Sequence, residues 1–334
     1  MSGRQENNRI TEEKITQGMV GYPGIIKDYY YSMTDRTAQT KKRYIMYIEQ
    51  FMDYLTEHGK NPSNISIYKK MKPSDINEYL EYIRYRKVNG KVVENGDSIR
   101  AAKYYALSSF FDFLANEEYI DNNPCLKVKA PKDRKQHEVI RMTSDEVYDV
   151  KEKILDGYGS HKQQAFNEKW KYRNLAIITL GCQTGLRATA LSEINMDDIN
   201  FEELCITVTE KGNITRPCYI SQKTAEVLKK WINNRKELMI GFDDCNALFI
   251  SNRRTRIASC TISLMLKNVT SDLNKNITPH KMRSTCATTL YSQTHDIYLV
   301  AEVLGHKNIS NTKRYTESSK EDKRRAADIL GNIF

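Results

Sequence analysis

Residues 279–315 of this sequence read PHKMRSTCATTLYSQTHDIYLVAEVLGHKNISNTKRY. His280 and Arg283 are three residues apart, so a helix would place both side chains on one turn. The apolar segment LVAEVL that follows predicts a short helix with one buried face, and Gly305 suits the C-terminus of such a helix. The stretch therefore predicts two helices, the first carrying an imidazole beside a guanidinium.

The same stretch continues with a second histidine, His306, and ends at Tyr315. Asn311 or Ser310 would cap a further helix, with Tyr315 in its first turns. Two imidazoles, a guanidinium and a phenol suit chemistry on a phosphate, because Arg binds its oxygens in a planar fork, His moves protons and Tyr can act as a nucleophile. Each residue alone has a simpler interpretation, since a lone His is usually structural and most of the 21 Tyr serve packing.

A second motif lies upstream, where TGLRATALSE places Arg187 just after a Gly-Leu turn. The apolar run YRNLAIITLGCQ before it predicts a buried helix, and Arg187 would begin the next one. The segments LCITVT and ITRPCYI flank a Gly-Asn turn, which indicates a β-hairpin. Lys211 lies at the tip of that hairpin.

These motifs, TGLR, KGN, HKMR, LGH and a tyrosine preceded by a basic residue, resemble those of the tyrosine recombinase (phage integrase) family of site-specific DNA recombinases. The resemblance covers the C-terminal half closely and the N-terminal half more loosely. The set it identifies as catalytic is Arg187, Lys211, His280, Arg283, His306 and Tyr315.

In that family Tyr315 would attack a DNA phosphodiester and form a 3′-phosphotyrosyl link, releasing a 5′-hydroxyl. Arg187 and Arg283 would neutralise the nonbridging oxygens, and Lys211 would protonate the leaving oxygen. The resemblance implies no metal, no ATP and no other cofactor, since the ester keeps the bond energy.

The two histidines have separate implied roles: His280 would assist proton movement at the tyrosine, and His306 would hydrogen-bond the phosphate. One departure concerns the family's acidic residue three after the first Arg, which is Ala190 here. Glu193 lies on another helical face and does not obviously replace it.

Length and composition limit the classes of protein to which the chain can belong. The 334 residues allow about two domains, and a net charge of +10 with a pI near 9.0 favours a polyanionic partner. Seven cysteines without a C-x-x-C pair favour reduced thiols over a disulfide framework or zinc site. The polar N-terminus resembles no secretion signal and no apolar run reaches the ~20 residues of a membrane span, so we expect a cytoplasmic protein of bacterial or phage type acting on DNA.

The expected fold is mainly α, with a small β-sheet or hairpin in the catalytic domain and a separate all-α domain before it. The family resemblance implies that the two would form a C-shaped clamp on DNA. We predict a mobile N-terminus at 1–20, a helical (SAM-like) core-binding domain at 21–126, a linker at 127–138 and a catalytic domain at 139–334. The apolar tail at about 320–334 would be exchanged between subunits.

Three basic clusters are candidates for DNA contact. The first opens the predicted helix 37–59, the second lies on the helix 98–120, whose inner face we expect to include Ile99, and the third precedes the helix that begins near 260. Their members are Lys41, Lys42 and Arg43; Arg100 and Lys103; and Arg253, Arg254 and Arg256.

The resemblance leaves several roles open. Integration or excision of a mobile element is favoured by Ala190 and the divergent N-terminus, and an Xer-like recombinase resolving chromosome or plasmid dimers is the alternative. A type IB topoisomerase-like enzyme and a non-catalytic DNA-binding protein of the same fold are further alternatives. The expected partners are double-stranded recombination sites bound by a homotetramer, with possible accessory DNA-bending proteins.

Overall fold

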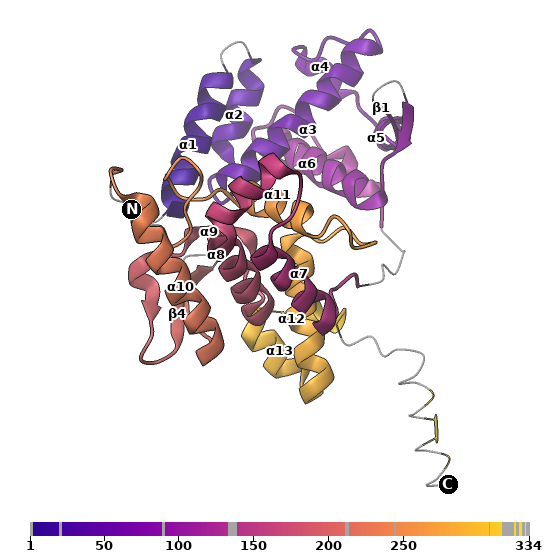
Figure 1. Ribbon diagram of the computed structural model, residues 1–334. Helices are drawn as coiled ribbons and strands as arrows, with labels where there is room; N and C mark the ends of the chain where they lie inside the picture. Colours follow the sequence, from indigo (N-terminus) through magenta and orange to yellow (C-terminus); the bar gives the residue numbers. More distant parts are fainter. Residues whose placement is uncertain are drawn as a thin grey trace. The chain divides into compact units, whose positions relative to one another are not determined.

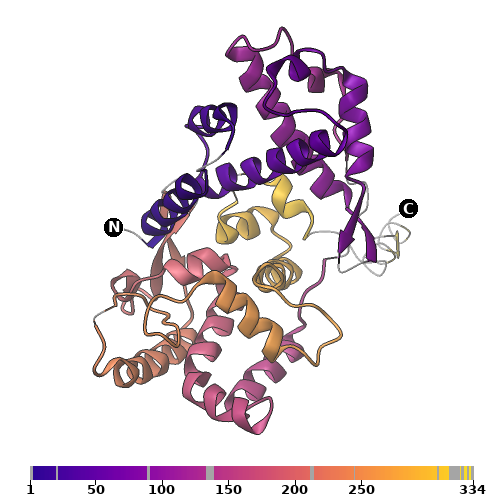
Figure 2. The ribbon, with the colours of Figure 1, turned by 90° about the horizontal axis from the view of Figure 1, so that it is seen from above.

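The computed structural model describes residues 3–19, 22–88, 91–132, 139–210, 214–243, 245–306 and 308–315, together with 324, 327, 328 and 331. The chain divides into two compact units, Met1–Gln136 and His137–Phe334. Both units consist mainly of helices, and each holds one small antiparallel sheet (Figures 1 and 2). The expected fold class, mainly helical with a hairpin in the C-terminal unit, is confirmed.

The first unit is a group of helices with one β-hairpin, whose register pairs Tyr85 with Glu94. Its elements are α1 (Gly3–Gly18), α2 (Gly24–Ser32), α3 (Ala38–Glu57), α4 (Ile65–Lys69), α5 (Pro73–Tyr82), β1 (Tyr85–Val88), β2 (Lys91–Glu94), α6 (Asp97–Asn116) and the 3₁₀ helix η1 (Pro124–Lys127).

Aromatic side chains dominate the core of this unit. Phe51 of α3 packs edge-on against Tyr79 of α5, with ring centroids 4.8 Å apart, and Phe110 and Phe111 of α6 are fully buried. The expectation for Ile99 is wrong: this side chain is 41% exposed. Ala106 and Phe110, on the same face of α6, are fully buried, so Ile99 is exposed because it lies in the first turn of the helix, at the edge of the core.

Residues 1–20 include the helix α1. We expected this segment to be mobile because it has few apolar side chains. Its Ile15 and the following Met19 are buried in the core of the first unit, and α1 packs against α3. Two well-spaced apolar side chains are thus enough to attach a helix that is otherwise polar.

The second unit adds a three-stranded antiparallel sheet of order β3-β4-β5 to a larger set of helices. Its elements are α7 (Ser144–Asp156), α8 (His161–Thr184), α9 (Ala188–Glu193), the 3₁₀ helix η2 (Met196–Asp198), β3 (Ile199–Asn200), β4 (Cys205–Glu210), β5 (Ile214–Tyr219), α10 (Gln222–Met239), α11 (Ser259–Val269), α12 (Pro279–Thr294), α13 (Ile297–Leu304) and α14 (Ser310–Lys313).

The long helix α8 is the centre of this unit, and α7, α10 and α12 all pack against it (Figure 1). Its apolar run Leu175–Leu180 is almost entirely buried, as the sequence predicts. At the start of the unit Thr143 caps α7 in a reciprocal capping box with Glu146. Among the helices of the described ranges, none has the length and apolar character needed to cross a bilayer.

Candidate active site

The helix α12 carries the first two candidate residues. Pro279 occupies its first turn, where a missing N–H costs nothing, and the helix then presents His280 and Arg283 one turn apart. His280 is exposed, whereas Arg283 is only 2% exposed. A guanidinium buried so deeply must be hydrogen-bonded on several sides.

Arg283 meets that need with two backbone carbonyls. Its Nη1 donates to the oxygen of Gly185 at 2.8 Å and its Nη2 donates to the oxygen of Leu304 at 2.7 Å. Gly185 ends α8 just before Arg187, and Leu304 ends α13 just before His306. The guanidinium therefore joins the turn before Arg187 to the turn before His306.

Gly185 allows the ends of α8 and α13 to lie close together for two reasons. Its φ of +62° is left-handed, as is usual for a helix C-terminus. A Cβ at this position would also lie 2.5 Å from Cδ2 of Leu304 and 3.3 Å from Sγ of Cys286. The end of α8 can approach α12 and α13 this closely only because the residue has no side chain.

Arg187 is the N-cap residue of α9 and is exposed, with extended backbone angles. Its charge reaches both candidate imidazoles, since it contributes to lowering the pKa of His280 and of His306. Ala190, in the place of the family's acid, is partly buried against the core, and Glu193 closes the helix.

His306 follows the left-handed Gly305, which ends α13 with a φ of +66° as expected. Its Nδ1 lies 2.8 Å from the hydroxyl of Thr312, a fully buried residue. Because Nδ1 is engaged within the protein, Nε2 is the ring nitrogen left to face a ligand.

Tyr315 is 4% exposed and packs with Cys286, Val300 and Leu304. Its ring stacks on that of His306, with centroids 6.4 Å apart and planes 10° from parallel. Its backbone N–H donates to the oxygen of Thr312 at 2.8 Å. The phenol and the second imidazole are thus held side by side through the segment that joins them.

The expected cap of the last helix is wrong in detail. The N-cap position is Ile309, rather than Asn311 or Ser310, and the side-chain oxygen of the preceding Asn308 accepts from the N–H of Ser310 at 2.8 Å. The resulting helix α14 is a single turn, and Tyr315 lies beyond its end instead of in its first turns. The helix begins at Ser310, one residue earlier than a Ser310 cap would place it and two earlier than an Asn311 cap would.

The electrostatic setting of the two imidazoles is strongly positive. Burial, followed by the charges of Arg283 and Arg187, lowers the pKa of His306 to about 4. Although the residue as a whole is exposed, partial desolvation of its ring and then the charges of Arg314 and Arg283 lower the pKa of His280 as well. Both rings are therefore neutral at pH 7, and the site presents fixed guanidinium charges to an anion.

Lys211 lies outside the residues that the structure describes. The strands on either side of it, β4 and β5, form the predicted hairpin and pair up to Glu210 and Ile214.

The DNA-contact candidates of the first unit lie on two helices. Lys42 and Arg43 are exposed in the first turns of α3, while the ammonium of Lys41 lies 4.9 Å from the ring centre of Tyr30. Arg100 of α6 is 16% exposed, donates twice to the carbonyl of Leu80 and pairs with Asp97. Its neighbour one turn on, Lys103, lines a surface cavity with residues of α3 and α5.

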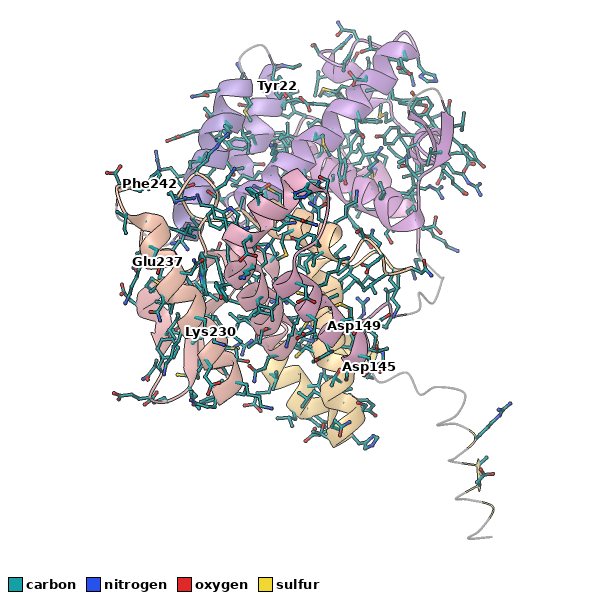
Figure 3. The ribbon with its side chains drawn as sticks, viewed as in Figure 1. Tyr22, Asp145, Asp149, Lys230, Glu237 and Phe242 are labelled. Carbon is teal, nitrogen blue, oxygen red and sulfur yellow. The ribbon has the colours of Figure 1, made fainter. Side chains whose placement is uncertain are left out.

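The third cluster is less uniform than its sequence suggests. Arg253 is exposed. Arg254 has a left-handed φ of +63° and lies between the rings of Trp170 and Phe242, each 5.0 Å away. Phe242 is labelled in Figure 3 just past the end of α10. The guanidinium of Arg254 is therefore engaged in packing.

Arg256 is likewise engaged within the unit: it donates to the carbonyls of Ser192 and Ile194 and to the side chain of Asn195 at 2.6 Å. It fixes the end of α9 and the bend after it. Arg253 is the member of the cluster whose side chain is available on the surface.

Two residues that sequence reasoning did not select support the site: Thr312 and Arg216, which donates to the carbonyl of Val303 at 3.1 Å. The turn at Gly185, between two predicted helices, was expected from the sequence and is observed. Thr312 and Arg216 had no such signal, because their partners are distant or lie across a turn.

Residues 141–322 match the family described as the phage integrase family. One similar relative is tyrosine recombinase XerC of Caldanaerobacter subterraneus subsp. tengcongensis, 27% identical over 328 residues that cover 92% of this chain and 86% of the relative.

Two solved structures share the fold. A XerH site-specific recombinase bound to palindromic difH substrate in a post-cleavage complex has a TM-score of 0.69 at 20% identity and covers 89% of this chain and 81% of that chain. A Tn1549 transposon integrase in complex with circular intermediate DNA has a TM-score of 0.67 at 19% identity and covers 92% of this chain and 99% of that chain.

Proposed function

The chain belongs to the phage integrase family of tyrosine recombinases, and from this membership and the site geometry we propose that it cuts and rejoins DNA at specific sites through a 3′-phosphotyrosyl intermediate. The observation that carries the proposal is the pair of hydrogen bonds from Arg283 to the carbonyls of Gly185 and Leu304. These bonds hold the turn before Arg187 and the turn before His306 close to the Arg283 guanidinium. The ring of Tyr315 stacks on that of His306, which follows the second of these turns.

The proposed reaction starts with attack of the Tyr315 oxygen on the scissile phosphorus. Arg187 and Arg283 lower the energy of the transition state by binding the nonbridging oxygens. Removing one such donor from a preorganised site typically costs about 10²–10³ in rate. The 5′-hydroxyl of another strand then reverses the attack and seals the exchanged junction.

Proton movement falls to the remaining groups. Neutral His280 accepts or relays the proton of the phenol, since its lowered pKa keeps it unprotonated at pH 7. His306 donates to the phosphate from Nε2, which requires the proton on that nitrogen and a Thr312 hydroxyl donating to Nδ1. Lys211 is the proposed general acid for the leaving 5′-oxygen, on the grounds of family resemblance.

Further parts of the proposal concern assembly. We assign DNA binding across the duplex to the helical first unit, with a clamp closing through the linker at 127–138, and exchange between four subunits to the tail at about 320–334. The target would be double-stranded recombination sites, a proposal supported by the difH substrate bound to XerH and the circular intermediate DNA bound to the Tn1549 integrase.

For the biological role we propose integration or excision of a mobile element. Ala190, in place of the usual acid, favours this role because a housekeeping enzyme is expected to keep the supporting carboxylate. The near full-length similarity to a XerC favours the second candidate, resolution of chromosome or plasmid dimers.

Covalent capture tests both levels of the proposal. The full chain is incubated with nicked fragments of host genomic DNA, denatured, and the covalently bound fragments are sequenced, with Tyr315→Phe as the matched control. Fragments trapped by the wild type alone support the chemistry. Enrichment at the ends of an element supports the first role, and enrichment at a single chromosomal or plasmid locus supports the second.

A further inference from the structure

The side chain of Arg216 crosses from the hairpin to the end of α13. It is half-buried on β5, and its Nη2 donates to the carbonyl oxygen of Val303 at 3.1 Å. Cys218, two residues along and so on the same face of the strand, is also buried. The bond of Arg216 therefore links this face of β5 to the end of α13.

The bond to Val303 completes the hydrogen bonding of a helix end. The last four carbonyls of a helix have no partner within it and carry partial negative charge. In α13 the oxygen of Ala301 accepts from the N–H of His306 and that of Glu302 from the N–H of Gly305. The other two accept from arginines, Val303 from Arg216 and Leu304 from Arg283.

His306 follows this fully satisfied end after a single glycine, so its position depends on how firmly the end is held. Two adjacent carbonyls bound by two guanidinia, one from the sheet and one from α12, leave the turn little freedom. Arg283 also faces the proposed phosphate, whereas Arg216 acts through the backbone of α13.

We propose that Arg216 is a positioning residue for His306: it fixes the C-terminal end of α13 so that the imidazole stays aligned with the reacting phosphate. This inference rests on the proposed function, in which His306 binds the phosphate. It assigns a role to a residue that belongs to no recognised motif of the sequence.

The test is a double-mutant cycle in single-turnover cleavage of a nicked duplex identified by covalent capture. The variants are Arg216→Gln, His306→Gln and the double variant. Arg216→Gln should slow cleavage about tenfold, the effect of one charge-assisted hydrogen bond. If Arg216 acts through His306, the double variant should be no slower than His306→Gln alone.

Two more variants separate positioning from stability. Arg216→Lys keeps a cation near the carbonyl and should recover part of the rate. Arg235→Lys is the control, because Arg235 donates to the carbonyl of Ala247 elsewhere in the same unit and has no contact with α13 among the described interactions. It should cleave at the wild-type rate for an equal fraction of folded protein.

A second measurement keeps the inference testable without activity. The histidine NMR signal of His306, assigned by its loss in His306→Gln, should shift in Arg216→Lys and stay in place in Arg235→Lys. Wild-type cleavage by Arg216→Gln, multiplicative losses in the double variant, or an unshifted signal would overturn the inference. Failure of the wild type to form any adduct would count against the proposed function, while the NMR comparison would still decide the positioning role.

Discussion

The guanidinium of Arg283 donates a 2.7 Å hydrogen bond to the carbonyl oxygen of Leu304, which ties a buried side chain of α12 to the last residue of α13. The same group holds Gly185, so one residue sets the distance between two turns that are over one hundred positions apart in the sequence. The site is therefore organised from a residue that also forms part of the fold.

Replacing this guanidinium should cost stability as well as activity. Arg283→Lys cannot reach both carbonyls, so at least one buried oxygen loses its partner. We expect a loss of about 2–4 kcal/mol in the free energy of unfolding. Urea titration followed by tryptophan fluorescence measures the stability of the second unit, because both tryptophans of the chain, Trp170 and Trp231, lie in that unit. An unchanged midpoint would show that the carbonyl bonds do not hold the site together.

Gly185→Ala tests the close approach of α8 to α13. The new methyl would meet Leu304 at 2.5 Å in a left-handed backbone, and we expect a loss of about 2–3 kcal/mol. Gly241→Ala is the matched control, since its φ is +79° and nothing lies within 4 Å of the added Cβ. The control should lose about 1 kcal/mol, from backbone strain alone. Equal losses in the two variants would mean that packing around Gly185 can relax.

Acid should weaken the second unit through His306. Its folded pKa of about 4 lies below the unfolded value near 6.5, so the protonated form favours the unfolded chain. The stability from keeping this ring neutral is complete above pH 6.5 and is lost as the pH falls toward 4, by up to about 3 kcal/mol. The free energies of unfolding of the wild type and of His306→Gln at pH 7.0, 5.5 and 4.5 measure this loss. The Gln variant should lose less stability between pH 7.0 and 4.5 than the wild type, and an equal loss in both would contradict the lowered pKa of His306.

The arginines of the basic loop before α11 should have different roles, with Arg253 contacting DNA and Arg256 stabilising the fold. Arg253→Gln should reduce the slope of log affinity against log salt by about 0.9, the value of one phosphate contact. Arg256→Gln should instead lower stability, because three acceptors lose their donor. Fluorescence anisotropy with a labelled duplex at several salt concentrations gives the slopes. A Arg256→Gln variant with wild-type stability and a reduced slope would reverse the assignment.

Local patterns predicted the elements of the site well. The three-residue spacing of His280 and Arg283 and the glycine after α13 both depend on neighbours within one or two turns, and both are observed. The start of α14 was misplaced because Asn308, Ser310 and Asn311 all offer a side-chain acceptor within four residues, and it is Asn308 that accepts from the N–H of Ser310.

Contacts between distant segments were beyond what the sequence predicts. Three arginines within four residues look alike as a basic cluster, yet Arg254 lies between two aromatic rings and Arg256 binds the end of α9. Nothing in their local sequence encodes Trp170 or Ser192 as partners. The same holds for Arg216, whose acceptor is on a helix more than eighty residues away.

The most direct test of the central claim is covalent adduct formation on a nicked duplex by the wild type and by Tyr315→Phe, resolved on a denaturing gel and mapped by peptide mass spectrometry. We predict a protein–DNA band for the wild type, with the DNA attached to the peptide that contains Tyr315, and none for the Phe variant. A band of equal intensity from Tyr315→Phe, or attachment at another residue, would contradict the account.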